Sequence, residues 1–219
     1  MPMKLIIANK NYSSWSLRGW LALEAFGVPF EEVKLPLFTD TFYDTLAQYT
    51  PVKKVPVLVD GDLSVWDSLA IAEYVNETYL DGKGWPADRA ARAVARATVA
   101  EMHCGYSAVR SAMPMNCRAR RHVAIDDAVR KDIAAIDAIW GEKRLPYADQ
   151  GEYLFGEFSL ADVFFAPVVF RFVTYGVELS DAAKAYQQTM LAHPAMKRWL
   201  ADALTETDVV EEDEAGEPI

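Results

Sequence analysis

The chain has 219 residues, of which 52% are hydrophobic and 25% are charged, so it can bury a sizeable core in one large domain or two small ones. Its net charge is −10, and seven of the acidic residues lie in residues 205–219, which leaves −3 for the rest of the chain. This balance argues against nucleic acid and against an anionic membrane surface as partners.

We find no secretory signal, because Lys4 is followed by only a short apolar run, and no apolar stretch is long enough to cross a bilayer. Cys104 and Cys117 have neither a CxxC nor a zinc-type spacing, and the three histidines form no HExxH motif. We therefore expect a cytoplasmic protein with reduced cysteines and no metal site.

In the first eighty residues, strand and helix patterns alternate. Apolar runs predict strands over residues 4–8, 30–35, 55–59 and 63–66. The patterns between and after them predict helices over residues 14–26, 40–49 and 67–75. The sequence therefore predicts a compact α/β domain with a mixed sheet over residues 1–80.

Strand signals stop after residues 81–87, whose two glycines and one proline predict a linker. Helices are then predicted over residues 88–113, 123–140, 162–175, 180–192 and 194–204. The helix from 162 is almost wholly apolar and follows a capping box, Ser159–Asp162, so we expect it in the middle of an all-helical domain over 88–204. Residues 205–219 are acidic and lack a core-building pattern, so we expect a flexible tail.

Three serines, Ser13, Ser14 and Ser16, lie between the first predicted strand and the first predicted helix. Serine usually caps a helix at such a place. The free backbone N–H groups and the positive dipole end of the helix also favour an anion there. The two roles are compatible, because one serine can cap the helix while its neighbour points into a cleft.

The order and spacing of four motifs resemble those of the cytosolic glutathione transferases of the serine type. These motifs are Ser13-(x4)-Arg18, Val55-Pro56-Val57-Leu58, Asp67-Ser68-Leu69-Ala70-Ile71 and the Ser159–Asp162 box. The resemblance covers nearly the whole chain except the acidic tail. It implies an N-terminal thioredoxin-like domain with a mixed sheet, a C-terminal helical bundle domain, glutathione as co-substrate and a homodimer.

For glutathione binding, the resemblance implies a cis peptide bond between Val55 and Pro56, with the backbone of Val55 pairing with the cysteinyl part of the tripeptide. Lys53 or Lys54 would then hold the glycyl carboxylate as a point charge. The simpler alternative is that Pro56 only protects the start of an edge strand.

Asp67 and Ser68 match the acid–serine pair with which the family starts its third helix. The resemblance implies that Ser68 and the helix N-terminus bind the γ-glutamyl carboxylate and that Asp67 pairs with the ammonium group. The family usually has Glu at the position of Asp67. The alternative is an ordinary helix cap.

Catalysis needs a thiolate, and a hydroxyl group that donates to sulfur at a helix N-terminus favours that charged form. The resemblance places Ser13 in the catalytic position, with Ser14 and Tyr12 as its competitors. No cysteine is near this turn in the sequence, which disfavours a dithiol mechanism.

The electrophile pocket is expected between the first domain and the predicted helix 88–113. On that helix, His103, Tyr106, Arg110 and Met113 are spaced three and four residues apart and would share one face. Together with Tyr12 they are candidates to line this pocket, and Arg110 suits an acidic group on the substrate. The alternative is a helix–helix or subunit contact with Arg110 in an ion pair.

The function implied by the resemblance is a glutathione transferase that joins the glutathione thiolate to a small electrophile, as in detoxification. One alternative is a glutathione-dependent isomerase of an unsaturated keto acid, because serine-type members include such isomerases. Others are a glutathione-dependent peroxidase or reductase, and a non-catalytic binding module that keeps the fold.

Overall fold

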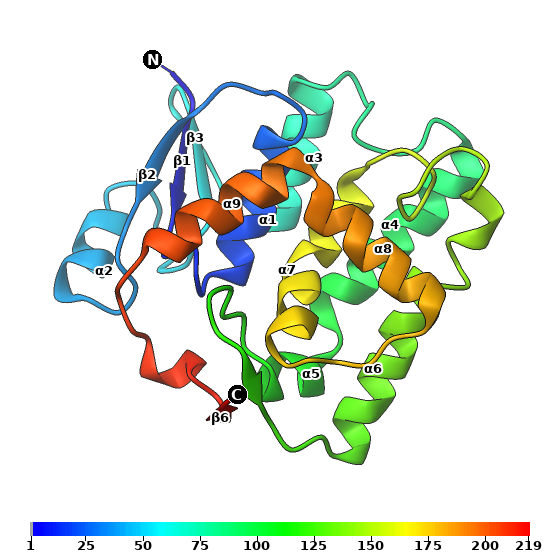
Figure 1. Ribbon diagram of the computed structural model, residues 1–219. Helices are drawn as coiled ribbons and strands as arrows, with labels where there is room; N and C mark the ends of the chain where they lie inside the picture. The colour runs from blue at the N-terminus through cyan, green and yellow to red at the C-terminus, as the bar shows by residue number, and fades with distance from the viewer. Residues whose placement is uncertain (1) are drawn as a thin grey trace.

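The computed structural model describes residues 2–219, apart from the side chain of Asp40. A four-stranded sheet with its helices is followed by an all-helical unit (Figure 1). The first unit contains β1 (Lys4–Ile7), α1 (Ser14–Glu24), β2 (Glu31–Lys34), α2 (Asp40–Leu46), β3 (Val57–Asp60), β4 (Leu63–Val65) and α3 (Ser68–Thr78). The predicted fold class is confirmed.

The sheet is mixed and has the strand order β2-β1-β3-β4. β1 pairs in parallel with β2 and antiparallel with β3, which in turn pairs antiparallel with β4. Side chains alternate along β1, so Leu5 and Ile7 pack into the main core, whereas Ile6 packs with Phe42 and Leu46 of α2. Both faces of this strand are thus covered, which explains its uninterrupted apolar sequence.

The second unit contains α4 (Arg89–Cys104), α5 (Ser107–Ala112), α6 (Asp127–Trp140), α7 (Leu160–Thr174), α8 (Asp181–Ala192) and α9 (Pro194–Thr205). The predicted capping box starts α7, with the backbone N–H of Ser159 donating to Oδ2 of Asp162 at 2.9 Å. α7 packs against α1, α4 and α8, as expected from its apolar sequence. Even so, within residues 2–219 no helix is both long and apolar enough to span a bilayer.

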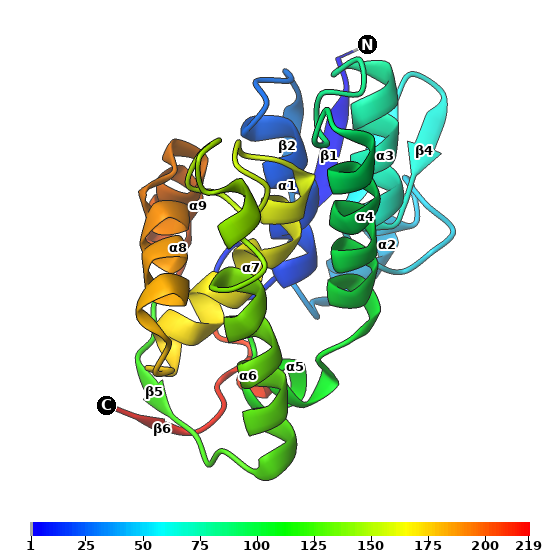
Figure 2. The same cartoon turned by 90° about the vertical axis from the view of Figure 1, so that its right-hand side faces the viewer.

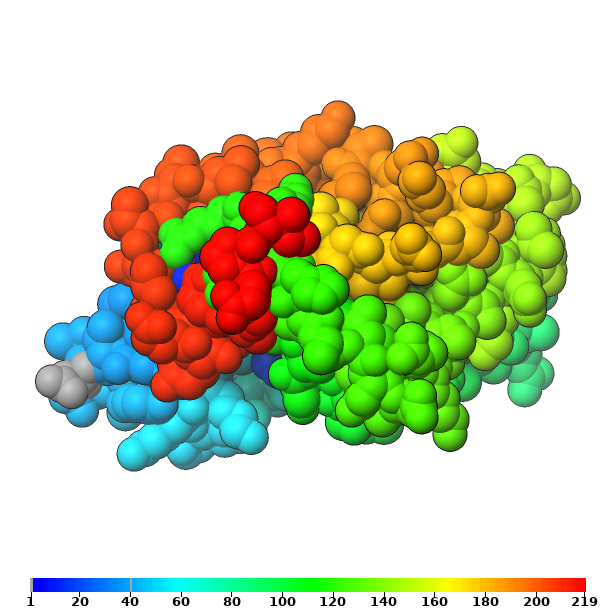
Figure 3. All heavy atoms as spheres, turned by 60° about the horizontal axis from the view of Figure 1, so that its bottom comes forward, coloured from blue at the N-terminus to red at the C-terminus, as the bar shows by residue number. Residues whose placement is uncertain are grey.

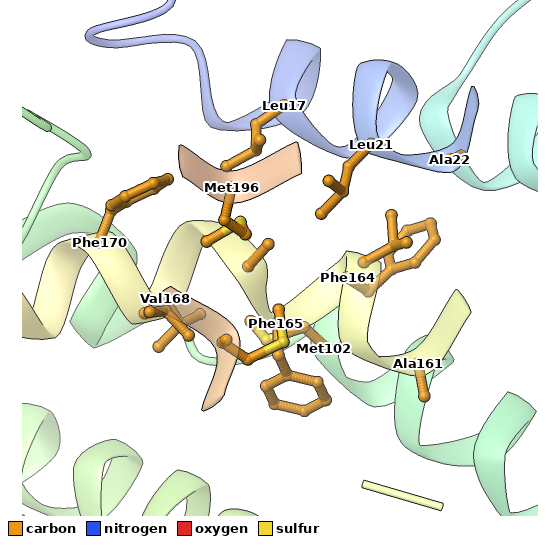
Figure 4. Packing of buried hydrophobic residues seen from close by; sticks show 14 of the residues in the cluster. Leu17, Leu21, Ala22, Met102, Ala161, Phe164, Phe165, Val168, Phe170 and Met196 are labelled. Carbon is orange, nitrogen blue, oxygen red and sulfur yellow. The ribbon is translucent and has the colours of Figure 1, made fainter. Parts of the chain in front are cut away.

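The two units share one hydrophobic core. Figure 4 shows Leu21 of α1 pointing toward α7, which carries Phe164, and Leu17 pointing toward Met196 of α9. All four side chains are almost fully buried. Because protein interiors are close-packed, this junction holds the first helix of the α/β unit in a fixed position relative to the helical unit.

Two predicted helices differ from the structure. The helix expected over 88–113 is broken, because Gly105 ends α4 in an extended conformation and Tyr106 has a left-handed φ of 56°. The helix expected from 123 begins only at Asp127, after Asp126 caps it. Just before it, β5 (Arg121–His122) pairs antiparallel with β6 (Glu217–Pro218), at the end of the molecule away from the N-terminus (Figures 1 and 2).

The acidic tail is packed against the protein, which differs from the flexible tail expected from the sequence. Figure 3 shows the tail, in red, lying against the green segment between α5 and α6. Arg121 donates to the carbonyl groups of Glu214, Ala215 and Gly216 and forms an ion pair of 2.8 Å with the Glu214 carboxylate. The tail is therefore held mainly by charge-assisted hydrogen bonds, which leave no apolar periodicity in the sequence.

Candidate active site

A cavity of about 890 Å³ lies where the two units meet. Most of the residues singled out in the sequence line it: Tyr12, Ser13, Ser14, Lys53, Lys54, Val55, Pro56, Asp67, Ser68, His103 and Arg110. Tyr106 and Met113 do not line it; both are buried in the core. The break between α4 and α5 is the reason, because it removes the shared helical face on which their selection depended.

Ser13 both caps α1 and lines the cavity. Its Oγ accepts a hydrogen bond from the backbone N–H of Ser16 at 3.3 Å and donates to Oγ of Ser16 at 2.7 Å. The Ser16 hydroxyl is fully buried and accepts from the backbone N–H of Ala8 at 3.0 Å. Ser16 therefore has a structural role behind Ser13, and of the three serines at this turn Ser13 and Ser14 line the cavity whereas Ser16 does not.

Ser14 is bonded to a buried arginine that the sequence reasoning missed. Nη2 of Arg171 in α7 donates to Oγ of Ser14 at 3.1 Å, and Nη1 donates to the carbonyl groups of Arg110 and Met113. Burial, with a further contribution from Arg110, lowers the pKa of Arg171 to about 10, so it is charged at neutral pH. The sequence contains one sign of this role, because Arg171 is the single charged residue inside the apolar run of α7 and a buried charge needs partners.

The hydroxyl of Tyr12 is already bound by other groups. It donates to Oε1 of Glu214 at 2.5 Å and accepts from Nη2 of Arg118 at 2.9 Å. Burial and the hydrogen bond to Glu214 raise the pKa of Tyr12. The ring of Tyr12 lines the cavity, but its hydroxyl would have to leave the tail to reach a sulfur atom there.

The Val55–Pro56 peptide bond is cis, and both residues line the cavity. Gly19 in α1 lies directly behind Pro56, since a Cβ atom on Gly19 would be 2.8 Å from Cγ of Pro56. Only a residue without a side chain lets the helix and the proline approach so closely. Lys53 and Lys54, which directly precede Val55 in the sequence, also line the cavity.

The N-terminus of α3 forms another wall. Oδ1 of Asp67 caps α3 by accepting from the backbone N–H groups of Leu69 and Ala70. Oδ2 of Asp67 lies 2.7 Å from Nε2 of His103. The hydroxyl of Ser68 is buried and has no hydrogen-bond partner within the described residues. A buried polar group without a partner is costly, so this hydroxyl suits a polar ligand atom in the cavity.

Arg110 has a different environment from the one expected. It donates to the carbonyl groups of Met102, His103 and Gly105, so it caps the C-terminus of α4 where the chain breaks. Its guanidinium also lies 5.0 Å from the centre of the Trp15 ring. Arg110 thus adds positive charge at the cavity wall while most of its hydrogen-bonding capacity is used by the backbone.

The fold places Cys117 close to the serine turn, where the sequence analysis expected no cysteine because the two segments are far apart in the chain. The backbone N–H of Cys117 donates to the carbonyl of Asn11 at 3.2 Å. Burial raises the pKa of the Cys117 thiol, so it stays protonated at neutral pH. Cys104 is exposed on α4, and neither cysteine lines the cavity.

Asp213 in η2 (Glu211–Asp213) brings an acid from the tail to the cavity wall. Burial raises the pKa of Asp213 to about 6, although the nearby positive charge of Arg171 favours the ionised form. The end of the cavity that contains Ser14 and Arg171 therefore contains a titratable carboxyl group as well.

A mixed four-stranded sheet with a cis-proline loop, followed by a helical unit with α7 at its centre, defines the two-domain glutathione transferase fold. Family models agree with this architecture. The glutathione S-transferase N-terminal domain matches residues 12–78, and the glutathione S-transferase C-terminal domain matches residues 89–202. The chain belongs to the glutathione S-transferase family.

Individual relatives are distant or match only in part. Dichloromethane dehalogenase of Methylorubrum extorquens is 48% identical over 62 residues, which cover 26% of this chain and only 20% of the dehalogenase. Maleylacetoacetate isomerase of Rattus norvegicus is 28% identical over 172 residues, 76% of either protein. The crystal structure of a glutathione transferase homolog from Burkholderia gl BGR1, with bound glutathione, has a TM-score of 0.69 and 22% identity, covering 94% of this chain and all of that one.

Proposed function

We propose that the protein is a glutathione transferase in which the hydroxyl of Ser13 holds the thiolate of bound glutathione. The observation that carries this proposal is that Ser13 at the start of α1, the Val55–Pro56 step and the unpartnered hydroxyl of Ser68 line one cavity. Family membership supports glutathione as the thiol. The bound glutathione in the Burkholderia homolog supports the same choice.

The chemistry begins with the thiol. A free thiol has a pKa of about 8.5, so little thiolate is present at neutral pH. The positive end of α1 and a hydroxyl donor favour the thiolate. If the Ser13 and Ser16 hydroxyl groups rotate, Ser16 donates to Ser13 and Ser13 donates to sulfur, in a chain that starts at the N–H of Ala8. The sulfur then attacks an electrophilic carbon, and a leaving group departs with its bonding electrons.

The other parts of the tripeptide have matching groups at the cavity wall. The Ser68 hydroxyl and the N-terminus of α3 suit the γ-glutamyl carboxylate, and Asp67 suits the ammonium group. The backbone of Val55 suits the cysteinyl backbone. Lys54 or Lys53 suits the glycyl carboxylate. This arrangement leaves the end of the cavity with Ser14 and Arg171 for the electrophile.

Two variants test the thiolate assignment. In Ser13→Ala, the pKa of bound glutathione should rise by about one unit, and kcat with an aryl halide should fall about tenfold. In Ser14→Ala, that pKa should stay at the wild-type value. The ultraviolet absorbance of the bound thiolate during a pH titration measures it. The reverse result would move the assignment to Ser14, and wild-type protein that binds immobilised glutathione without turnover would be a binding module.

A second candidate function is isomerisation of an unsaturated keto acid. The specific observation in its favour is the charged Arg171 bonded to Ser14 at the cavity wall, with Arg110 beside it. Such a pair of cations suits a substrate carboxylate. Arg171→Gln should then raise KM for maleylacetoacetate about tenfold and leave KM for an uncharged aryl halide within about twofold. The rat relative's name motivates this substrate.

The homodimer and the cytoplasmic location implied by the family resemblance stay predictions. Sedimentation of the purified chain and fractionation of its cells would test them separately from the chemistry.

A further inference from the structure

Residues 9–12, in the loop between β1 and α1, are bound by a carboxylate that comes from the opposite end of the sequence. Glu206 lies just after α9, and its side chain is only 3% exposed. Its Oε1 accepts from the backbone N–H of Lys10 and its Oε2 from that of Asn11, each at 2.9 Å. Nζ of Lys34 lies 2.9 Å from Oε1 and compensates the charge. Both oxygens of one buried carboxylate are thus committed to this loop.

Two further segments hold the same loop. Nδ2 of Asn9 donates to Oδ2 of Asp208 in the tail at 2.8 Å. The side chain of Asn11 donates to Oδ1 of Asn116 at 2.9 Å and accepts from the backbone N–H of Arg118 at 2.9 Å. The loop therefore has little freedom of its own, and its conformation depends on residues of the helical unit and the tail.

The backbone of the loop transmits this constraint to Ser13. The N–H of Ser13 donates to the carbonyl of Asn9 at 2.9 Å, so residues 9–13 form a closed turn. The N–H groups at the middle of this turn, those of Lys10 and Asn11, are the ones that bind Glu206. Glu206 itself does not line the cavity, so it acts on the site only through the turn.

We propose that Glu206 is a positioning residue for the thiol site, whose carboxylate holds the Lys10–Asn11 turn in the geometry that presents the Ser13 hydroxyl to sulfur. The inference rests on the proposed function of Ser13. A side chain that cannot reach both N–H groups leaves them buried without an acceptor, and the turn must then move to find water. A shift of this kind changes a hydrogen bond to sulfur without removing any group that binds the rest of glutathione.

The decisive variant is Glu206→Asp, which keeps the negative charge and shortens its reach by one methylene group. Its matched control is Glu211→Asp in the same tail, because Glu211 is exposed. In Glu206→Asp, the pKa of bound glutathione should rise by about half a unit, and kcat should fall about threefold, less than in Ser13→Ala. KM for glutathione should stay within about twofold of wild type. The control should match wild type in all three quantities.

A folded Glu206→Asp protein with wild-type thiol pKa and kcat would overturn the inference, even if its thermal stability fell. Ser13→Ala keeps this failure separate from a failure of the proposed function. If Ser13→Ala also leaves the thiol pKa unchanged, the assignment of Ser13 is wrong, and not merely the role of Glu206. If Glu206→Asp does not fold, Glu206→Gln keeps the length and one acceptor oxygen; its kcat should fall about threefold, and an unchanged kcat would reject the proposal.

Discussion

Nε2 of His103 lies 2.7 Å from Oδ2 of Asp67, which joins the last turn of α4 to the N-cap of α3. The other oxygen of Asp67 accepts from the first turn of α3, so the carboxylate is fixed in orientation before any ligand arrives. The sequence placed His103 in the electrophile pocket and Asp67 at the ammonium group of glutathione. In the structure the two side chains contact each other at the cavity wall.

Replacing Asp67 with Asn should weaken glutathione binding without unfolding α3. Asn caps helices as well as Asp does, but it lacks the negative charge that suits the ammonium group. We expect KM for glutathione to rise about tenfold, because hydrogen bonds to charged groups contribute about 1.5–3 kcal/mol. Asp62→Asn, at an exposed turn, is the matched control. An unchanged KM would mean that the Asp67 carboxylate serves only the cap and His103.

Replacing Tyr12 with Phe should leave the thiol pKa of bound glutathione at the wild-type value. The Tyr12 hydroxyl is bonded to Glu214 and Arg118, so its removal affects the attachment of the tail. The free energy of unfolding should fall by about 1–2 kcal/mol in urea denaturation. A thiol pKa that rises as in Ser13→Ala would instead identify Tyr12 as the donor to sulfur.

Asp213 should make the binding of anionic ligands depend on pH. Its pKa is raised to about 6, mainly by burial, so it is neutral well below that pH and negative above it. The affinity for benzenesulfonate, which stays ionised, should therefore fall severalfold from about pH 5 to pH 7 as Asp213 becomes negative near Arg171. Calorimetric titration measures this affinity. The fall should be absent in Asp213→Asn and present in the exposed control Glu211→Gln.

Gly19→Ala should destabilise the protein although alanine is the better helix former. In a free helix the change would be favourable by about 0.5–1 kcal/mol. Here the new Cβ would lie 2.8 Å from Cγ of Pro56, so α1 or the Val55–Pro56 loop must shift. We expect a net loss of about 1–3 kcal/mol in unfolding free energy and a higher KM for glutathione. Equal or greater stability would show that the proline yields without strain.

The fold could be predicted because its signals are local. Strand periodicity, the Ser159–Asp162 box and the apolar run of α7 each report on neighbouring residues, and each was confirmed. The prediction of one long helix over residues 88–113 was wrong at Gly105. There a glycine followed by Tyr106 in a left-handed conformation ends the helix, although the apolar pattern continues. In that case backbone conformation outweighed side-chain periodicity.

The parts of the site that could not be predicted depend on contacts between distant segments. In the sequence, Arg171 only interrupts the apolar run of α7. Its hydrogen bond to Ser14 is visible only in the folded structure. The acidic tail was predicted to be flexible because its partners, Arg118 and Arg121, are about ninety residues away in the sequence. Ion pairs and hydrogen bonds of this kind have no period along the chain, so no window of sequence contains them.

The contact between Glu206 and Lys10 spans 196 positions of the sequence. During synthesis the sheet strands and α1 leave the ribosome early, whereas the carboxylate that fixes their connecting turn arrives among the last residues of those described. A nascent chain that already contains every group proposed to bind glutathione would therefore still lack the carboxylate that fixes the turn before Ser13. If Ser13 and Glu206 act as proposed, the position of the serine hydroxyl is fixed only after residue 206 has been synthesised.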